Sequence, residues 1–272
     1  MMRPFLPGSR VAAWGFVVIV SAACAQSVNY GHAGPRFAAL PTAEPPDRAD
    51  QSVRVVTWNV KFGHRIDEAA DVLRNDAALR DADVVLLQEV DEADAARLAT
   101  GLGAGYVYYP ATAHWKNGEH FGNAVVSRWP LVNDRKLVLP RTDWAHGTQR
   151  AAVVATALVA GRPIRVYSVH FATLFEVGAA GVEAQARAII RDAEGSRDPV
   201  IVGGDLNVDY IGRLFHAEGW EWVTRDVGAT RAVFALDHLF VRGFDEGPRR
   251  AGKVAADDFP SDHAAVWGAI GR

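Results

Sequence analysis

The sequence predicts an α/β (α+β) fold in which mixed β-sheets are covered by helices. Short apolar runs of the length of buried strands recur from Val53 to Ile270, and segments with apolar residues at helical spacing separate some of them. Several runs follow one another with little helix between them, which is typical of a mixed sheet rather than a doubly wound parallel one. The roughly 220 residues of this part are enough for one hydrophobic core.

The predicted elements follow in chain order. Val53 to Trp58 is an apolar strand, and Ile66 to Leu79 places apolar residues at helical spacing beside charged ones. The further predicted strands are 83–87, 106–109, 124–127, 152–159, 164–170, 200–203, 236–241 and 264–270, and the further predicted helices are 92–102 and 178–194.

Composition limits the classes of function. The chain has 272 residues, of which 49% are hydrophobic and 22% charged, as in ordinary globular proteins. With 29 Lys and Arg against 32 Asp and Glu, the formal net charge is −3, so the basic excess of a non-specific nucleic-acid binder is absent. A local basic patch or bound divalent cations could still serve a phosphate substrate.

Residues 1–25 have the pattern of a bacterial export signal. Arginines flank a polar start, and Val11 to Ala23 is almost wholly apolar but short for a membrane span. Residues 23–25 form an A-x-A-like cleavage site, whereas residues 21–24 resemble a lipoprotein box that would lipidate Cys24, with Ser21 in place of the usual leucine. We expect an exported protein, either secreted or held at the cell envelope by a membrane tether through Cys24. An uncleaved anchor or a buried helix is the alternative.

Residues 26–52 are predicted to be a flexible, Pro-rich tether, because they contain four prolines and no apolar periodicity. The folded domain is then 53–272. Cys24 is the only cysteine, so no internal disulfide is expected. We expect the protein to be a monomer.

One segment has the clearest chemical pattern. An apolar strand from Val200 runs into Gly203 and Gly204 and is followed by Asp205 and Asn207. The two glycines predict a tight turn, since they lack a Cβ. The acid and the amide then lie at the carboxyl end of a strand, where α/β proteins tend to place their chemistry.

Polar side chains follow or begin other strands in the same way. They are Asn59, Glu89, His170, Asp237, Asp262 and His263. Carboxylate and amide oxygens suit a hard cation such as Mg²⁺, and histidines supply proton transfer. Hydrolysis of a phosphate ester needs this combination, because charge on the phosphate oxygens must be stabilised.

The motifs WNV, LQEV, GNAVVSR, SVHF, GDLN, LDHLFV and SDH occur in this order between Val53 and Ile270. Together they resemble the endonuclease/exonuclease/phosphatase superfamily, which includes deoxyribonucleases, abasic-site endonucleases, sphingomyelinases and inositol-polyphosphate phosphatases. GDLN and SDH are the more specific motifs. The resemblance implies a four-layer sandwich of two packed mixed β-sheets flanked by helices.

The resemblance also implies a role for each site residue. Glu89 would be the principal ligand of Mg²⁺ or Mn²⁺, with Asn59 beside it and Asp262 in the same metal cluster. Asp205 would orient or deprotonate the attacking water, and Asn207 would hold the phosphate.

The remaining roles concern the substrate phosphate. His263 would contact it, oriented by Asp237. His170 matches the second histidine of the deoxyribonuclease-like branch, where abasic-site enzymes carry a tyrosine. Asn123 and Arg150 fall where the family places phosphate-contacting side chains.

The expected function follows from these roles. Lys61 stands where abasic-site endonucleases carry an acid, which argues against that branch. We expect a divalent-metal-dependent phosphodiesterase that hydrolyses phosphate esters by in-line attack of water, acting on nucleic acid as an exported endonuclease or exonuclease. The alternatives are a phospholipid (sphingomyelinase-like) or inositol-phosphate phosphoesterase, although no apolar hairpin for membrane contact is evident, and a non-catalytic envelope binding module.

Other polar residues are open to two interpretations. The loop from His114 to His120, together with Trp144 and His146, could line a substrate groove or be an ordinary solvated loop. Asp209 is expected to stabilise a turn. His238 should face away from its neighbour Asp237, because successive strand residues point to opposite faces.

Overall fold

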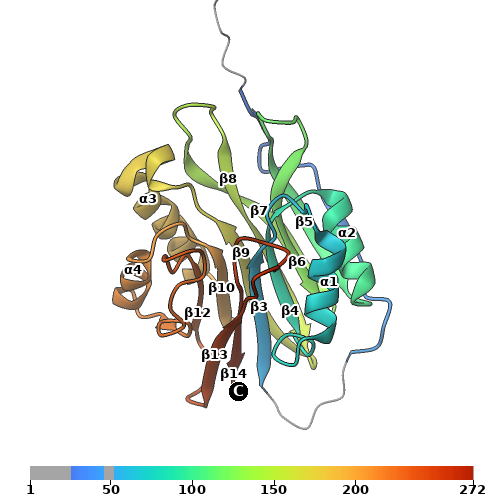
Figure 1. Ribbon diagram of the computed structural model, residues 1–272. Coiled ribbons are helices and arrows are strands. Elements are labelled where there is room, and N and C mark those ends of the chain that lie inside the picture. The colour runs from blue at the N-terminus through green and yellow to red at the C-terminus, as the bar shows by residue number, and fades with distance from the viewer. Residues whose placement is uncertain (1–25, 46–51, 272) are drawn as a thin grey trace, which may run out of the picture.

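The computed structural model describes residues 26–45 and 52–271, and its strands form two sheets packed face to face (Figure 1). The eight-stranded sheet has the order β1-β5-β6-β4-β3-β14-β13, with β2 paired to β5. Its strands are β1 (Val28–Asn29), β2 (Phe37–Ala39), β3 (Val53–Asn59), β4 (Val84–Val90), β5 (Gly105–Ala113), β6 (His120–Ser127), β13 (Arg249–Val254) and β14 (Ala265–Ile270).

The second sheet has six strands in the order β11-β12-β10-β9-β8-β7. They are β7 (Leu131–Thr142), β8 (Gln149–Val159), β9 (Arg162–His170), β10 (Val200–Asp205), β11 (Glu221–Trp222) and β12 (Asp237–Arg242). Among the described strand pairs, β3 with β4 and β9 with β10 run parallel and the others antiparallel, so both sheets are mixed.

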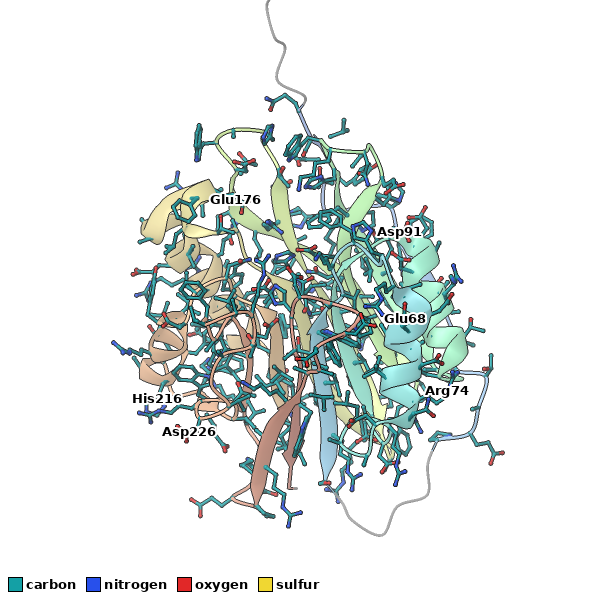
Figure 2. All side chains as sticks on the ribbon, in the orientation of Figure 1. Glu68, Arg74, Asp91, Glu176, His216 and Asp226 are labelled. Carbon is teal, nitrogen blue, oxygen red and sulfur yellow. The ribbon has the colours of Figure 1, made fainter. Side chains whose placement is uncertain are left out.

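Helices cover the outer face of each sheet and complete four layers. On one side lie α1 (Ile66–Asn75) and α2 (Glu92–Gly101), and on the other α3 (Leu174–Glu194) and α4 (Ile211–Ala217) (Figure 1). Separate apolar cores lie under each helical layer, and a third core lies between the sheets; Figure 2 draws the side chains on the ribbon. The predicted fold class is therefore confirmed. In the part of the chain that the structure describes, no helix is both long and apolar enough to cross a membrane.

The predicted elements are present, with different ends. Helix α1 stops at Asn75 rather than Leu79, because Asp76 is extended and its carboxylate accepts the backbone N–H of Ala78 at 2.8 Å. Helix α4 and the edge strands β7, β11 and β13 were not predicted from the sequence. An edge strand buries only part of its side chains, so it lacks the apolar run by which buried strands are found.

The prediction of a flexible tether is wrong for residues 26–45. Strands β1 and β2 both pair with β5, and Arg36 forms a two-pronged ion pair with Asp134 at 2.6 and 2.8 Å. This segment is held by backbone hydrogen bonds and one ion pair, neither of which leaves apolar periodicity in a sequence. The predicted signal, the Cys24 lipidation site and residues 46–51 lie outside the described residues.

The two glycines before Asp205 serve close packing and not a tight turn. Both lie within β10, where neither has a positive φ. A Cβ on Gly203 would come within 2.6 Å of Leu239 and Leu86, and one on Gly204 within 1.9 Å of the Val169 carbonyl oxygen. The glycines thus let the strands approach each other beside the site.

Replacing Gly204 by alanine tests this packing. The added Cβ meets backbone of the neighbouring strand, so we expect the free energy of unfolding to fall by about 3 kcal/mol. Urea denaturation measures the change. Gly195→Ala is the matched control, since a Cβ there would lie 3.7 Å from the Asp192 carbonyl oxygen, an ordinary contact distance. Equal stability of the two variants would contradict the packing role.

Candidate active site

The candidate site lies where strands of both sheets end side by side. Asn59 ends β3, His170 ends β9 and Asp205 ends β10, while Asp237 begins β12 directly opposite Asp205. Parallel pairing brings the ends of β9 and β10 to one edge, and Asp205 is in register with His170. A cleft of about 600 Å³ is lined by Glu89 and His263, which contact Asn59 and Asp237 of this buried group.

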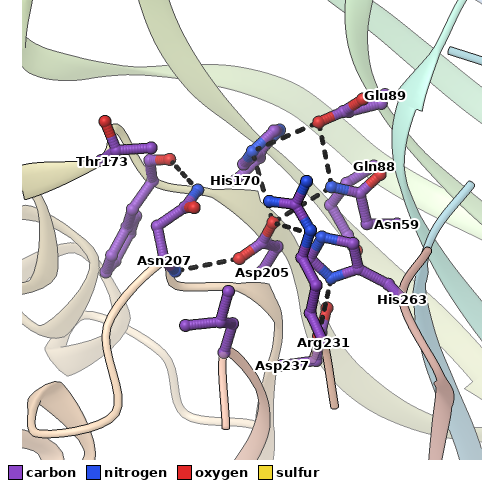
Figure 3. A network of polar contacts seen from close by, with 12 residues as sticks. Asn59, Gln88, Glu89, His170, Thr173, Asp205, Asn207, Arg231, Asp237 and His263 are labelled. Atoms are coloured by element: carbon purple, nitrogen blue, oxygen red, sulfur yellow. Dashed lines mark hydrogen bonds and ion pairs between the residues drawn. The ribbon is translucent and has the colours of Figure 1, made fainter. Parts of the chain in front are cut away.

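Asn59 is the bridge between the two sheets at this point. Its buried amide nitrogen lies 3.0 Å from Glu89 Oε1 and 3.0 Å from Asp205 Oδ2, and donates to both (Figure 3). Its Oδ1 accepts the backbone N–H of Lys61 at 3.0 Å. The orientation of the amide is therefore determined by three partners, and it holds two carboxylates close together.

Glu89 is directed into the cleft by an unusual backbone. Its φ is +57°, a left-handed conformation that is uncommon for glutamate, and the pairing of β4 with β6 is irregular between Gln88 and Val90. Such a conformation costs on the order of 1–3 kcal/mol and is concentrated at functional sites. The bulge separates Glu89 from the regular alternation of the strand.

Asp205 is the buried centre of the cluster. Its Oδ1 accepts the backbone N–H of Asn207 at 2.9 Å, and its Oδ2 lies 3.6 Å from His170 Nε2 and 3.7 Å from His263 Nε2. Burial, followed by repulsion from Asp237, raises the pKa of the Asp205 carboxyl above its usual range, although His263 opposes the shift. A carboxylate with a raised pKa is a better proton acceptor.

His263 is held as a cation by Asp237. Its Nδ1 lies 2.9 Å from Asp237 Oδ2, which also accepts a hydrogen bond from Thr230 Oγ1 at 2.6 Å. Burial alone would lower the pKa of His263, but the charge and hydrogen bond of Asp237 raise it to about 9. At neutral pH the imidazolium therefore presents an N–H from Nε2 towards the cleft.

His170 is neutral, in contrast. It is buried, and Arg150 Nη1 lies 3.0 and 3.1 Å from its two ring nitrogens. Burial, followed by repulsion from the Arg150 guanidinium, puts the pKa of His170 well below its usual range. Arg150 itself pairs with Glu176, both of whose carboxylate oxygens lie 3.2 Å from Nη2.

The two predicted phosphate-holding amides also make structural contacts. Asn123 donates to the carbonyl oxygens of Ala151 at 2.7 Å and Ser168 at 3.2 Å, so it ties β6 of one sheet to β8 and β9 of the other. Asn207, at a φ of +55°, donates to the Phe171 carbonyl at 2.9 Å. The second amide hydrogen of Asn207 is available to a phosphate, whereas the partners of Asn123 occupy its amide nitrogen.

Asp262 lies on the cleft wall among cations. Its Oδ2 is 2.7 Å from Arg231 Nη2 and 3.9 Å from Lys61 Nζ. Partial burial would raise the pKa of Asp262, but the hydrogen bond and charge of Arg231 hold it below its usual range. Asp262 is thus ionised, although the structure pairs it with cations rather than with Glu89.

Three residues of the site were not predicted. Arg231 reaches over the cluster from the loop before β12 (Figure 3), Thr230 positions Asp237, and Glu176 neutralises Arg150. None of them belongs to a motif quoted above, and Thr230 and Arg231 lie in a loop with no regular pattern. Thr173 and Glu176 do form a capping box at the start of α3, which a T-x-x-E pattern could have revealed.

The ambiguous loops border the cleft. His114, Trp115, Lys116, Trp144 and His146 all line it, and the rings of Trp115 and His146 stack with centroids 3.7 Å apart. The groove-lining interpretation is therefore the correct one. His238 faces away from the site, as the strand alternation predicts.

The donor set fits a hard divalent cation. Glu89 and Asp205 supply carboxylate oxygens on either side of the Asn59 amide nitrogen, and Asp205, Asp237 and His263 place ligand atoms within 4.8 Å of one another. One buried oxygen, Asp237 Oδ1, has no hydrogen-bond partner within the described part of the chain. The carboxylates of Glu89, Asp205 and Asp237 lie close together, so a bound cation would relieve their mutual repulsion.

A two-sheet sandwich with this cluster at its strand ends defines a phosphoesterase class of protein. A family model described as the Endonuclease/Exonuclease/phosphatase family matches residues 56–263. The chain belongs to this family, whose members are phosphoesterases and nucleases. A search of curated proteins found no significant match.

Solved structures support the same fold. An endonuclease/exonuclease/phosphatase protein from Beutenbergia cavernae is 22% identical, with a TM-score of 0.66 over 81% of this chain and 72% of that one. A family protein from Leptotrichia buccalis is 18% identical, with a TM-score of 0.65 over 81% of this chain and 100% of its own. TDP2 from D. rerio, in complex with a single-strand DNA product, is 16% identical, with a TM-score of 0.64 over 82% and 100%.

Proposed function

We propose that this protein is a divalent-metal-dependent phosphodiesterase that hydrolyses its substrate by in-line attack of water. The observation that carries the proposal is the single buried cluster in which Asn59 joins Glu89 to Asp205, with the His263 cation 3.7 Å from Asp205. It combines a proton acceptor, a charged donor and a carboxylate for a cation, which are the groups that phosphate-ester hydrolysis requires.

Each buried residue of the cluster has a separate role in the proposed hydrolysis. Asp205 accepts a proton from the attacking water, because burial has made its carboxylate more basic. His263 donates from Nε2 to a phosphate oxygen and stabilises the charge that develops there. Asp237 keeps His263 protonated and oriented. His170, being neutral, can donate or accept one hydrogen bond at the phosphate without adding charge.

Glu89 would hold Mg²⁺ or Mn²⁺, with Asn59 positioning its carboxylate and Asp262 available at the cleft wall. When bound, the ion would neutralise negative charge on the phosphate oxygens. Arg150 and Arg231 supply further positive charge along the same cleft.

Two substrate classes remain candidates. Nucleic acid is supported by the TDP2 relative with its single-strand DNA product and by the stacked Trp115 and His146 in the cleft. However, the lining residues include four Lys and Arg and four Asp and Glu side chains, so the cleft has no basic excess apart from the His263 cation. A phosphate ester of a membrane lipid is the second class. It is favoured by the start of the described chain, which contacts the cleft rim at His146. Export and a monomeric state stay predictions.

The test separates the reaction from its substrate. The full chain is assayed with bis(p-nitrophenyl) phosphate, plasmid DNA, single-stranded DNA, RNA, phospholipid vesicles and inositol phosphates, each with Mg²⁺ and with EDTA. We expect hydrolysis of the small diester that EDTA abolishes and that His263→Gln lowers by roughly 10²-fold or more. His216→Gln, on an exposed helical position, is the matched control. A correctly folded chain that hydrolyses none of these substrates would contradict the proposal and favour a binding module.

A further inference from the structure

The described chain begins at the rim of the cleft. Gln26 donates to the Ala145 carbonyl at 3.3 Å, the backbone N–H of Ser27 donates to the His146 carbonyl at 2.9 Å, and Asn29 donates to the Gly147 carbonyl at 2.7 Å. The loop that they contact lines the cleft through residues 143–146. In Figure 1 the blue start of the described chain, the turn joining β7 to β8 and the start of α3 lie at the same end of the domain.

Large apolar side chains are exposed at this rim. Trp144 is 79% exposed and Phe175 is 91% exposed, and the neighbouring Leu174 is 40% exposed. Trp144 donates from its indole nitrogen to the Phe175 carbonyl at 2.5 Å and from its backbone to the Glu176 carbonyl at 3.2 Å. The loop that contains Trp144 is therefore joined to the first turn of α3. Trp144, Leu174 and Phe175 are called the rim patch below.

The sequence before Gln26 points to what covers the rim patch. Val11 to Ala23 is apolar, and Cys24 stands two residues before Gln26. Two residues span at most about 7 Å. Because residues 26–45 are docked on the sheet and are not a tether, a chain held in a bilayer at Cys24 or through the apolar segment would keep the cleft rim against that bilayer.

We propose that the cleft end of this domain docks on a lipid bilayer, with the rim patch in the membrane interface. Tryptophan and phenylalanine are suited to that interface, where apolar rings are buried beside polar headgroups. Lys61, Lys116 and Arg231 line the cleft behind the patch and face the headgroup phosphates. In this orientation the docked cleft opens onto the bilayer surface. The substrate is then a phosphate ester of a membrane lipid, an inference that rests on the proposed phosphodiesterase activity.

Fluorescence quenching by brominated lipids tests the orientation. The full chain is mixed with vesicles of phosphatidylethanolamine and phosphatidylglycerol that contain a brominated phospholipid. Trp14 lies in the apolar segment and would be quenched wherever the rim lies, so every chain in this test carries Trp14→Phe. Trp144 is then one of seven tryptophans, and Trp144→Phe is expected to remove about one seventh of the fluorescence and most of the quenching at the rim. The matched control carries Leu40→Trp in the Trp144→Phe chain. Leu40 is 77% exposed and follows Ala39, which pairs with Tyr106 near the start of β5, so the new indole should not be quenched.

A second variant removes the patch itself. In a chain that begins at Gln26, where the described fold starts, and so lacks both Cys24 and the apolar segment, Trp144→Ser with Phe175→Ser is expected to lower co-flotation with the same vesicles at least tenfold, whereas Leu40→Ser should not change it. Quenching that is independent of Trp144, equal quenching of the Leu40→Trp indole, or single-stranded DNA binding at the rim in place of vesicles would overturn the docking.

Hydrolysis of bis(p-nitrophenyl) phosphate is measured on the same samples. Docking without hydrolysis overturns the phosphodiesterase proposal alone, and hydrolysis without docking overturns this inference alone.

Discussion

Glu89→Gln is expected to lower kcat for a phosphodiester by roughly 10³-fold, the largest effect of any conservative change in the site. Glutamine has the same shape and its amide oxygen can still accept the hydrogen bond from Asn59. The substitution therefore removes the negative charge and leaves the packing in place. Initial rates with bis(p-nitrophenyl) phosphate over a Mg²⁺ titration measure the effect, which should include a higher metal concentration for half-maximal activity.

The control for this variant is Glu183→Gln, an exposed position on α3. It removes the same charge from the chain as a whole but not from the cleft, so kcat and the metal response should match those of the unsubstituted protein. Wild-type kcat and metal response in Glu89→Gln would show that Glu89 is not a ligand.

Asp237→Asn is expected to lower kcat by about 10²- to 10³-fold at neutral pH. Without the Asp237 carboxylate, only the charges of Asp205 and Asp262 oppose burial, so the pKa of His263 falls below about 9. His263 is needed as a cation, so the activity of the unsubstituted protein should decline as the pH rises through about 9, and that decline should move to lower pH in the variant.

The pH profile of kcat distinguishes this positioning role from a loss of folding. A destabilised variant would lose activity at every pH, whereas Asp237→Asn should recover part of it as the pH falls. Asp226→Asn, at an exposed position, is the matched control and should keep the alkaline limb near pH 9. An unchanged profile in Asp237→Asn would contradict the pairing of Asp237 with His263.

Much of the site could be predicted because its residues stand at the ends of buried strands. Asn59, His170 and Asp205 each end an apolar run, and parallel pairing of such strands brings their ends to one edge of a sheet. Motif order then implied which side chains would meet. The structure brings together Asn59, Glu89 and Asp205, as well as His263 and Asp237.

Other features depend on contacts that no local pattern encodes. Arg231 reaches Asp262 from an irregular loop, and residues 26–45 are held on β5 by backbone pairing. The packing role of Gly203 and Gly204 depends on side chains from distant strands, so the sequence alone suggested only a turn. The exposed rim patch likewise forms only when the fold places the loop at Trp144 beside the start of α3 at Leu174 and Phe175.

The stereochemistry of hydrolysis tests the central claim most directly. A phosphorothioate diester that is chiral at phosphorus is hydrolysed in water enriched in heavy oxygen, and the configuration of the product is determined. Direct in-line attack by a water that Asp205 deprotonates predicts inversion at phosphorus, with one heavy oxygen in the product. Retention would require a covalent intermediate, for example on His170 or His263, and would contradict the account.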